Sequence, residues 1–188
     1  WGGAGLLGLS GWVEVLAGLV VLDLFDYWWH RLNHRVAFFW RFHRAHHSDT
    51  HLDAATSLRF HLGELILSGG AKALWILAWG PSLLAFAVFE AAVTAYAQFH
   101  HANIDLPPGV ERLVRLIHMT PRLHAAHHTA ARRTRDKNFS TVFLWWDRLF
   151  GTLAEATEDE LAVLGLPEGR HSDLSPGWFL AAPLRLGP

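Results

Sequence analysis

The sequence predicts an all-α integral membrane protein: a helical bundle in the bilayer with a cytosolic helical cap that holds a histidine-rich dimetal site. Three observations lead to this prediction. Half of the 188 residues are hydrophobic and only 18% are charged. Two long apolar runs follow each other closely along the chain. The 14 histidines gather mainly in clusters that flank those runs.

The first apolar stretch covers residues 2–29 and is rich in Leu, Val and Gly. Only Glu14, Asp23 and Asp26 interrupt it. It is long enough to cross a bilayer, and its end runs straight into the first histidines. The chain opens on Trp1 instead of Met, so we expect a segment of a longer protein.

Two further apolar runs, residues 62–79 and 82–100, are separated by Gly80–Pro81. Each has about the 20 residues that span a hydrocarbon core, so the pair predicts a membrane hairpin. Of the sixteen Lys and Arg residues, only Lys72 lies inside it. By the positive-inside rule, the flanking regions that carry the histidines face the cytoplasm. A soluble bundle with very apolar core helices is the alternative.

Three charged residues lie within the hairpin, namely Glu64, Lys72 and Glu90. Charges are costly in lipid, so we expect these side chains to face protein or a cavity. The preceding region, residues 30–61, is polar and basic, with a helical pattern around its histidines.

Beyond the hairpin, Pro-Pro-Gly at residues 107–109 predicts a turn before a helix that carries the last histidine cluster. From Glu155 onward the chain is acidic and then rich in Pro and Gly. We therefore expect one membrane domain over residues 1–154 and a loosely ordered tail over residues 155–188.

The histidine clusters are the most informative feature of the chain. The first is HxxxH, and two near copies of HxxHH, RFHRAHHS and RLHAAHHT, lie 81 positions apart. Residues at i, i+3 and i+4 share a helix face, so we expect the three imidazoles of each copy to converge. Polar ring nitrogens need partners, and imidazole suits iron, zinc, copper and nickel. Eight ligands are too many for one ion, which predicts two metals.

Composition excludes several other kinds of site. The chain has no cysteine, which rules out disulfides, thiolate-ligated haem and cysteine-held iron–sulfur clusters. The zinc-protease pattern HExxH is absent, and so is a Ser or Cys nucleophile elbow. No basic tract with interleaved aromatics suggests a nucleic-acid partner. A nitrogen-rich site without thiolates is consistent with iron acting on dioxygen.

Six motifs in order resemble those of the fatty acid hydroxylase/sterol desaturase superfamily of membrane histidine-box di-iron oxygenases. They are YWWHRLNHR, FWRFHRAHHSD, SLRFHLGE, FHHANIDLP, TPRLHAAHH and WWDRLFGT, and they cover roughly residues 20–152. The resemblance implies a four-helix membrane anchor under a cytosolic cap. It also implies two irons, dioxygen as co-substrate, an external electron donor and a lipid substrate.

The resemblance carries over residue by residue to nine metal ligands, with no catalytic side chain beyond them. These ligands are His30, His34, His43, His46, His47, His101, His124, His127 and His128. The middle motif departs from the hydroxylase branch, where it is itself HxxxH, because Ala97 and Tyr96 stand four residues before His101 and His100. The expected ligand count is therefore nine instead of ten.

Further residues are candidates for a place around the metals or the substrate. The free N–H groups of ligating imidazoles need acceptors, for which the candidates are Asp23, Asp26, Asp49, Asp53, Asp136 and Glu64. A solvated carboxylate or an Arg partner is an equally open interpretation for each. The other candidates are His51, His61, His100 and Asn103, with His61 expected either beside the metal ligands or at the substrate pocket. His118 and His171 are expected outside the site.

These inferences lead to two functional hypotheses. The first is a multi-pass membrane di-iron enzyme that hydroxylates or desaturates an unactivated C–H bond of a sterol, fatty acyl, ether lipid or carotenoid. Its electrons would come from a ferredoxin or a cytochrome b5-like protein. The second is a non-catalytic histidine-rich membrane protein that binds or transports metal. Transport would favour ligands strung along the hairpin, whereas the histidine clusters flank it.

Overall fold

A computed structural model describes residues 1–167 and 176–184. The described residues form helices and turns, with isolated bridges between His118 and Phe143 and between Thr129 and Leu164 but no strand. The all-helical prediction is therefore confirmed for this part of the chain.

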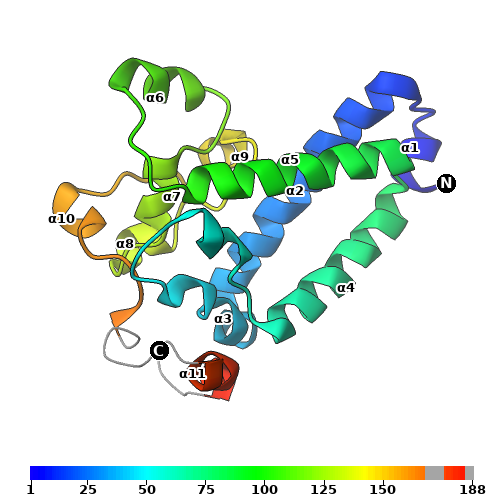
Figure 1. Ribbon diagram of the computed structural model, residues 1–188. Coiled ribbons are helices and arrows are strands. Elements are labelled where there is room, and N and C mark those ends of the chain that lie inside the picture. Colours follow the sequence, from blue (N-terminus) through cyan, green and yellow to red (C-terminus); the bar gives the residue numbers. More distant parts are fainter. Residues whose placement is uncertain (168–175, 185–188) are drawn as a thin grey trace.

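Three long helices form one half of the molecule (Figure 1). They are α2 (Gly11–Arg35), α4 (Leu62–Trp79) and α5 (Leu83–His101), and the short α1 (Gly2–Leu6) precedes them. Helix α2 packs against α5, with Gly18 placed so that an added Cβ would lie 3.2 Å from the Ala85 Cβ. The predicted runs 62–79 and 82–100 agree with α4 and α5 to within one residue.

The turn between α4 and α5 follows from its residues. Gly80 ends α4 with a left-handed φ of 68°, a conformation that glycine adopts without steric cost. Pro81 cannot continue the helix, and the Ser82 hydroxyl then accepts from the Ala85 amide to cap α5. The buried Glu14 carboxylate accepts from the Ser82 amide at 2.9 Å, which ties the turn to α2.

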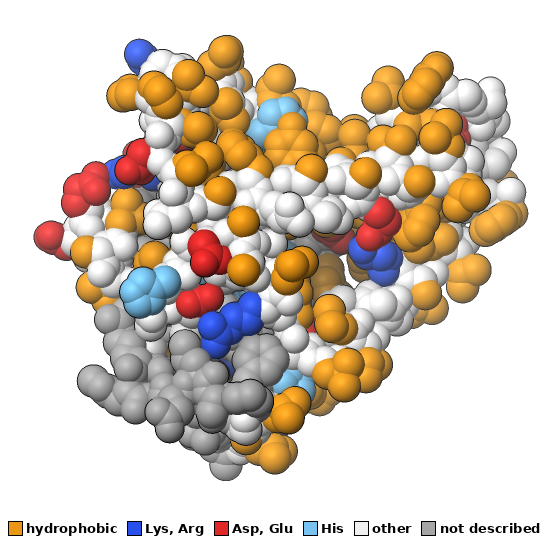
Figure 2. All heavy atoms as spheres, viewed as in Figure 1, with side chains coloured by type: hydrophobic (Ala, Val, Ile, Leu, Met, Phe, Trp, Pro, Cys, Tyr) orange, Lys and Arg blue, Asp and Glu red, His pale blue; other side chains and the backbone are white. Residues whose placement is uncertain are grey.

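Helices α4 and α5 are each long and apolar enough to cross a membrane. Little of either helix is buried, whereas the core helix of a soluble protein would be mostly buried. Hydrophobic side chains are spread along the visible face of this hairpin (Figure 2). Leu74 and Leu83, for example, are 71% and 84% exposed.

The first apolar stretch differs from its prediction as one membrane span. It breaks after α1, and the 25-residue α2 carries three acidic residues that lower its hydropathy. Two of these acids have structural partners, because Glu14 holds the α4–α5 turn and Asp23 holds backbone amides of a distant loop. Against the four membrane helices that the resemblance implies, two of the described helices, α4 and α5, have the length and hydropathy of a membrane span.

The other half of the molecule is built from short helices (Figure 1). They are α3 (Ala37–His43), η1 (His46–Ser48), η2 (Ala54–Leu58), α6 (Pro108–Val114), α7 (Pro121–His127), α8 (Arg132–Arg135), α9 (Trp145–Leu149), α10 (Glu158–Leu161), α11 (Pro176–Ala181) and η4 (Ala182–Leu184). We call the part formed by residues 36–61 and 102–167 the cap.

Two sequence predictions about the cap need correction. The helix after Pro-Pro-Gly is α6, and it ends at Val114, so it does not carry the last histidine cluster. That cluster lies on α7, a separate helix that Thr120 caps and Pro121 starts. Part of the predicted loose tail is also folded: Glu160 pairs with Arg133, and Leu166 is buried.

Candidate metal centre

The structure brings the nine predicted ligands into two groups. The five-histidine group contains His30, His34, His43, His47 and His127. The four-histidine group contains His46, His101, His124 and His128. Within each group the candidate ligand atoms all lie within 4.8 Å of one another. Both groups can therefore hold a metal ion.

Each HxxHH copy is divided between the groups. His43 and His47 join the five-histidine group, whereas His46 joins the four-histidine group. The second copy divides in the opposite way, because His127 is separated from His124 and His128. The predicted convergence of three rings is therefore wrong. The reason is local: α3 ends at His43 and α7 ends at His127, so neither copy stays on one continuous helix face.

The five-histidine group has a consistent hydrogen-bond pattern. Four rings are held at Nδ1 by an acceptor, as His43 is by Glu64 at 2.6 Å and His127 by the Lys137 carbonyl at 2.6 Å. His30 is held by the Phe139 carbonyl and His34 by Asp136. A neutral ring that donates from Nδ1 keeps its lone pair on Nε2.

The opposite nitrogen of each of these four rings is buried and has no hydrogen-bond partner among the described residues. Both ring nitrogens of His47 are likewise buried and have no hydrogen-bond partner among the described residues. Burying a polar nitrogen without a partner is unfavourable. Lone pairs that converge from anchored rings are what a metal ion requires.

In the four-histidine group, the distances between ring nitrogens fit a bound metal ion. The Nε2 atom of His101 lies 3.2 Å from that of His46 and 3.0 Å from that of His124. The Nε2 atoms of His124 and His128 are 3.2 Å apart. Two nitrogens that each bind one ion at about 2.1 Å, at a right angle, lie about 3.0 Å from each other. The spacing therefore suits shared coordination.

Burial keeps the cap imidazoles neutral. It lowers the pKa well below the usual histidine range, and neighbouring histidines lower it further, for His46, His47, His124, His127 and His128. A neutral imidazole is the form that binds metal.

We expect the metal-free protein to lose stability as the pH falls below about 6.5, the ordinary histidine pKa. In that range the unfolded chain binds protons that the folded chain does not, which costs about 1.4 kcal/mol per pH unit for each such histidine. The measurement is the thermal unfolding midpoint of metal-free protein in detergent between about pH 7.5 and 5.5. A flat profile would contradict neutral buried rings.

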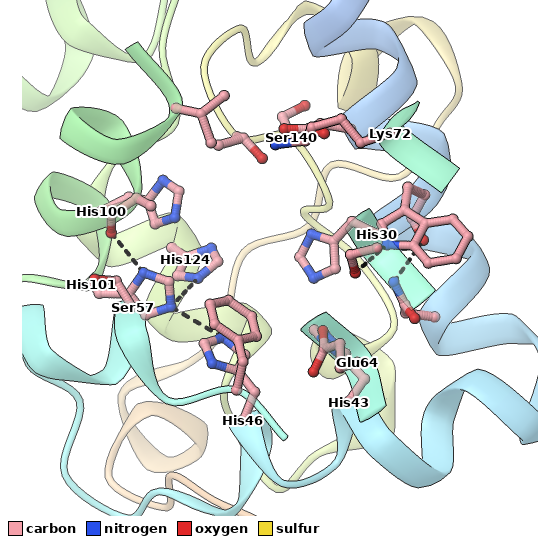
Figure 3. Close-up of a pocket in the computed structure, with 18 of the residues that line it drawn as sticks. His30, His43, His46, Ser57, Glu64, Lys72, His100, His101, His124 and Ser140 are labelled. Carbon is pink, nitrogen blue, oxygen red and sulfur yellow. Dashed lines mark hydrogen bonds and ion pairs between the residues drawn. The ribbon is translucent and has the colours of Figure 1, made fainter. Parts of the chain in front are cut away.

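A cavity of about 180 Å³ lies beside both groups. Figure 3 shows His46, His100, His101 and His124 on one side of it and His30, His43 and Glu64 on the other. Aromatic and aliphatic side chains of α2 and α5 complete the wall, including Phe25, Trp29 and Val93. A largely apolar cavity of this kind can accept a hydrocarbon group next to the candidate metal ions.

The other predicted residues have different surroundings in the structure. Glu64 and Asp136 hold histidine rings, and Asp26 and His100 line the cavity. Asp23 accepts from the Val142 and Phe143 amides and from the Trp146 indole, so it holds a loop and not a histidine.

The remaining candidates contact residues other than the nine grouped histidines or are exposed. Asp49 binds Thr56 and Arg59, and Asp53 caps η2. His51 and Asn103 are exposed. His61 accepts from the Gly63 amide, and the rings of Phe42 and His61 lie 5.4 Å apart. His118 contacts the Tyr96 hydroxyl, and His171 is outside the described residues.

Sequence reasoning missed the loop that anchors the histidines, residues 136–141. Its backbone supplies the carbonyls of Lys137 and Phe139, which no side-chain pattern reveals. The buried Asp147 carboxylate holds this loop through the amides of Phe139 and Ser140. A carboxylate inside the aromatic run WWDRLF is the signal that points to it.

Comparison with known proteins gives a family and several relatives. The family model for fatty acid hydroxylase matches residues 15–152. The ornithine lipid hydroxylase OlsE of Rhizobium tropici is 33% identical over 81% of this chain and 45% of its own length. Alkylglycerol monooxygenases of Danio rerio and Homo sapiens are each 32% identical, over 85% and 84% of this chain.

The chain spans less than half the length of these three relatives, since it covers 34% of each alkylglycerol monooxygenase. No solved structure matches it significantly. The family match extends from α2 to the residue after the left-handed Gly151 and includes all nine grouped histidines. The chain belongs to the fatty acid hydroxylase family.

Proposed function

We propose that this chain forms a membrane di-iron oxygenase that hydroxylates or desaturates an unactivated C–H bond of a lipid, using dioxygen and electrons from an external donor. The observation that carries the proposal is the pair of buried histidine groups beside one largely apolar cavity. The relatives' names support a lipid substrate, because they describe a lipid hydroxylase and alkylglycerol monooxygenases. A ferredoxin or a cytochrome b5-like protein is the proposed donor.

The nine grouped histidines would hold the two irons, which when bound supply the activation of dioxygen. The chain's own residues prepare the site. Glu64, Asp136 and two backbone carbonyls keep a proton on Nδ1 of four rings, so that Nε2 is free to bind metal. The apolar wall binds the hydrocarbon and excludes water from it.

The experiment that tests this function is oxygen incorporation. Iron-loaded protein is given a chemical reductant, isotopically labelled dioxygen and a total lipid extract, and the lipids are analysed by mass spectrometry. The proposal predicts a lipid that gains one labelled oxygen atom or loses two hydrogens. Unchanged lipids from protein that retains its iron and consumes no dioxygen would contradict it.

We further propose that α4 and α5 cross the membrane and place the metal centre on the cytoplasmic face. The support is the length and exposed apolar surface of both helices, together with the basic residues that flank them.

We expect cysteines at positions 51 and 83 to be labelled from opposite sides of the membrane. The chain has no native cysteine, and both His51 and Leu83 are exposed. A membrane-impermeant maleimide should label Leu83→Cys in intact cells and His51→Cys only after permeabilisation. Labelling of both variants from the same side would contradict the hairpin.

A further inference from the structure

Two charged side chains, Asp26 and Lys72, line the cavity away from His43, and a third, Glu90, pairs with Lys72. Lys72 on α4 and Glu90 on α5 form an ion pair with Nζ and Oε1 2.7 Å apart. Asp26 on α2 lines the same cavity as Lys72, close enough for their charges to interact. The Lys72 ammonium also lies 5.5 Å from the centre of the buried Phe89 ring. Three helices thus contribute one ionisable group each.

The charges of this cluster do not balance. One ammonium faces two carboxylates, and Glu90 already takes the direct ion pair. The Asp26 carboxylate has no hydrogen-bond donor among the described residues. Ionisable groups between membrane helices are costly and are a sign of function when they face a cavity. The cluster therefore has an acceptor, and a shared ammonium, available for a ligand.

Lys72 lies away from the His43 end of the cavity, whereas Asp26 is one helical turn before His30 on α2. Glu64, which holds His43, and Lys72 are eight residues apart on α4, which corresponds to about 12 Å along the helix axis. Figure 3 shows Lys72 at the edge of the cavity away from His43 and His46. Between Glu64 and Lys72 on α4, Ser68 accepts from the Trp29 indole, and both residues line the cavity.

We propose that Lys72 and Asp26 bind a hydroxyl group of the lipid substrate and so fix which carbon reaches the metal centre. This inference rests on the proposed function. A hydroxyl accepts from the Lys72 ammonium and donates to the Asp26 carboxylate, whereas either charged group alone satisfies only one role. A carboxylate or phosphate would be repelled by Glu90 and Asp26, and an ammonium by Lys72. The substrate class is a neutral hydroxylated lipid.

The test is binding to metal-free protein in detergent, with hexadecanol, hexadecane and hexadecanoate as probes that compete for radiolabelled hexadecanol. We expect hexadecanol to bind about tenfold more tightly than hexadecane, the effect of one hydrogen bond to a charged group. Hexadecanoate should bind no more tightly than hexadecane. Equal affinities of the alcohol and the alkane would overturn the proposal.

Two sets of variants assign the effect to the cluster. Asp26→Leu, which removes the acceptor at similar volume, and the neutral pair Lys72→Met with Glu90→Gln should both lose most of the preference for the alcohol while hexadecane affinity is unchanged. Leu74→Ala is the matched control, because Leu74 is on the same helix and exposed, outside the cavity lining. A preference that survives in both cluster variants would overturn the assignment.

The binding assay needs no iron, so its outcome is independent of the oxygenase proposal. If labelled oxygen enters a lipid but alcohols show no preference, only the hydroxyl site is wrong. In the active enzyme, the oxidised carbon should lie at a constant distance from the hydroxyl in alcohols of different chain length. In Asp26→Leu that constant position should be lost.

Discussion

Replacing His46 by alanine is expected to abolish turnover and to remove one of the two metal ions while the protein still inserts into the membrane. His46 is 2% exposed, and its Nε2 atom lies 3.2 Å from that of His101. Loss of a residue that only orients a ligand costs about 10- to 100-fold in metal affinity or activity, and loss of a ligand should cost more. We expect the apolar surface of α4 and α5 to drive insertion, and this substitution leaves that surface unchanged.

Metal content, turnover and membrane extraction are measured together. The control is His51→Ala, because His51 lies five residues further along and is exposed outside both groups. It should keep both metals and full activity. His127→Ala should lose a metal from the five-histidine group with the same loss of turnover. Wild-type turnover from either His46→Ala or His127→Ala would refute the ligand assignment.

Replacing Asp147 by alanine is expected to destabilise the cap by about 3 kcal/mol or more, because several donors to a buried charge lose their acceptor. The fully buried Asp147 carboxylate accepts from the Phe139 amide at 2.9 Å and the Ser140 amide at 2.8 Å. It also accepts from the Thr152 hydroxyl at 2.6 Å. Since the Phe139 carbonyl holds His30, metal retention should fall together with stability.

The unfolding midpoint and the metal content of Asp147→Ala are compared with those of Asp105→Ala. Asp105 is exposed, so its loss should change neither quantity. An unchanged midpoint in Asp147→Ala would show that residues 136–141 keep their conformation without this carboxylate.

Much of the site could be predicted from the sequence because its histidines occur in repeated motifs. The nine histidines expected to act together are the nine that the structure brings into two groups. The apolar hairpin and its turn could also be predicted, because Gly80, Pro81 and Ser82 each act through a local backbone or capping preference.

The division of each HxxHH copy between two groups could not be predicted from spacing. The i, i+3, i+4 rule assumes a continuous α-helix, and both copies lie where a helix ends. Nor could spacing reveal that the Phe139 and Lys137 carbonyls hold histidines, because a backbone group carries no sequence signature. Asn138, with a left-handed φ of 57°, gives that loop its bend and is buried by tertiary contacts.

The sequence also does not reveal which carboxylates hold histidine rings. Glu64 and Asp136 hold rings, but Asp23 holds amides of a segment more than a hundred residues away along the chain. All of these residues are acidic and lie near histidines or apolar runs in the sequence, so composition cannot separate them. Only the three-dimensional path of the loop that contains Val142 and Phe143 does so.

The most direct test of a di-iron centre is metal analysis of protein purified without oxygen after growth with added iron. The account predicts two irons per chain, bound by the five-histidine and four-histidine groups, and a change in absorption when dioxygen is added. One labile zinc per chain with no response to dioxygen would contradict the di-iron centre and favour a non-catalytic metal-binding protein.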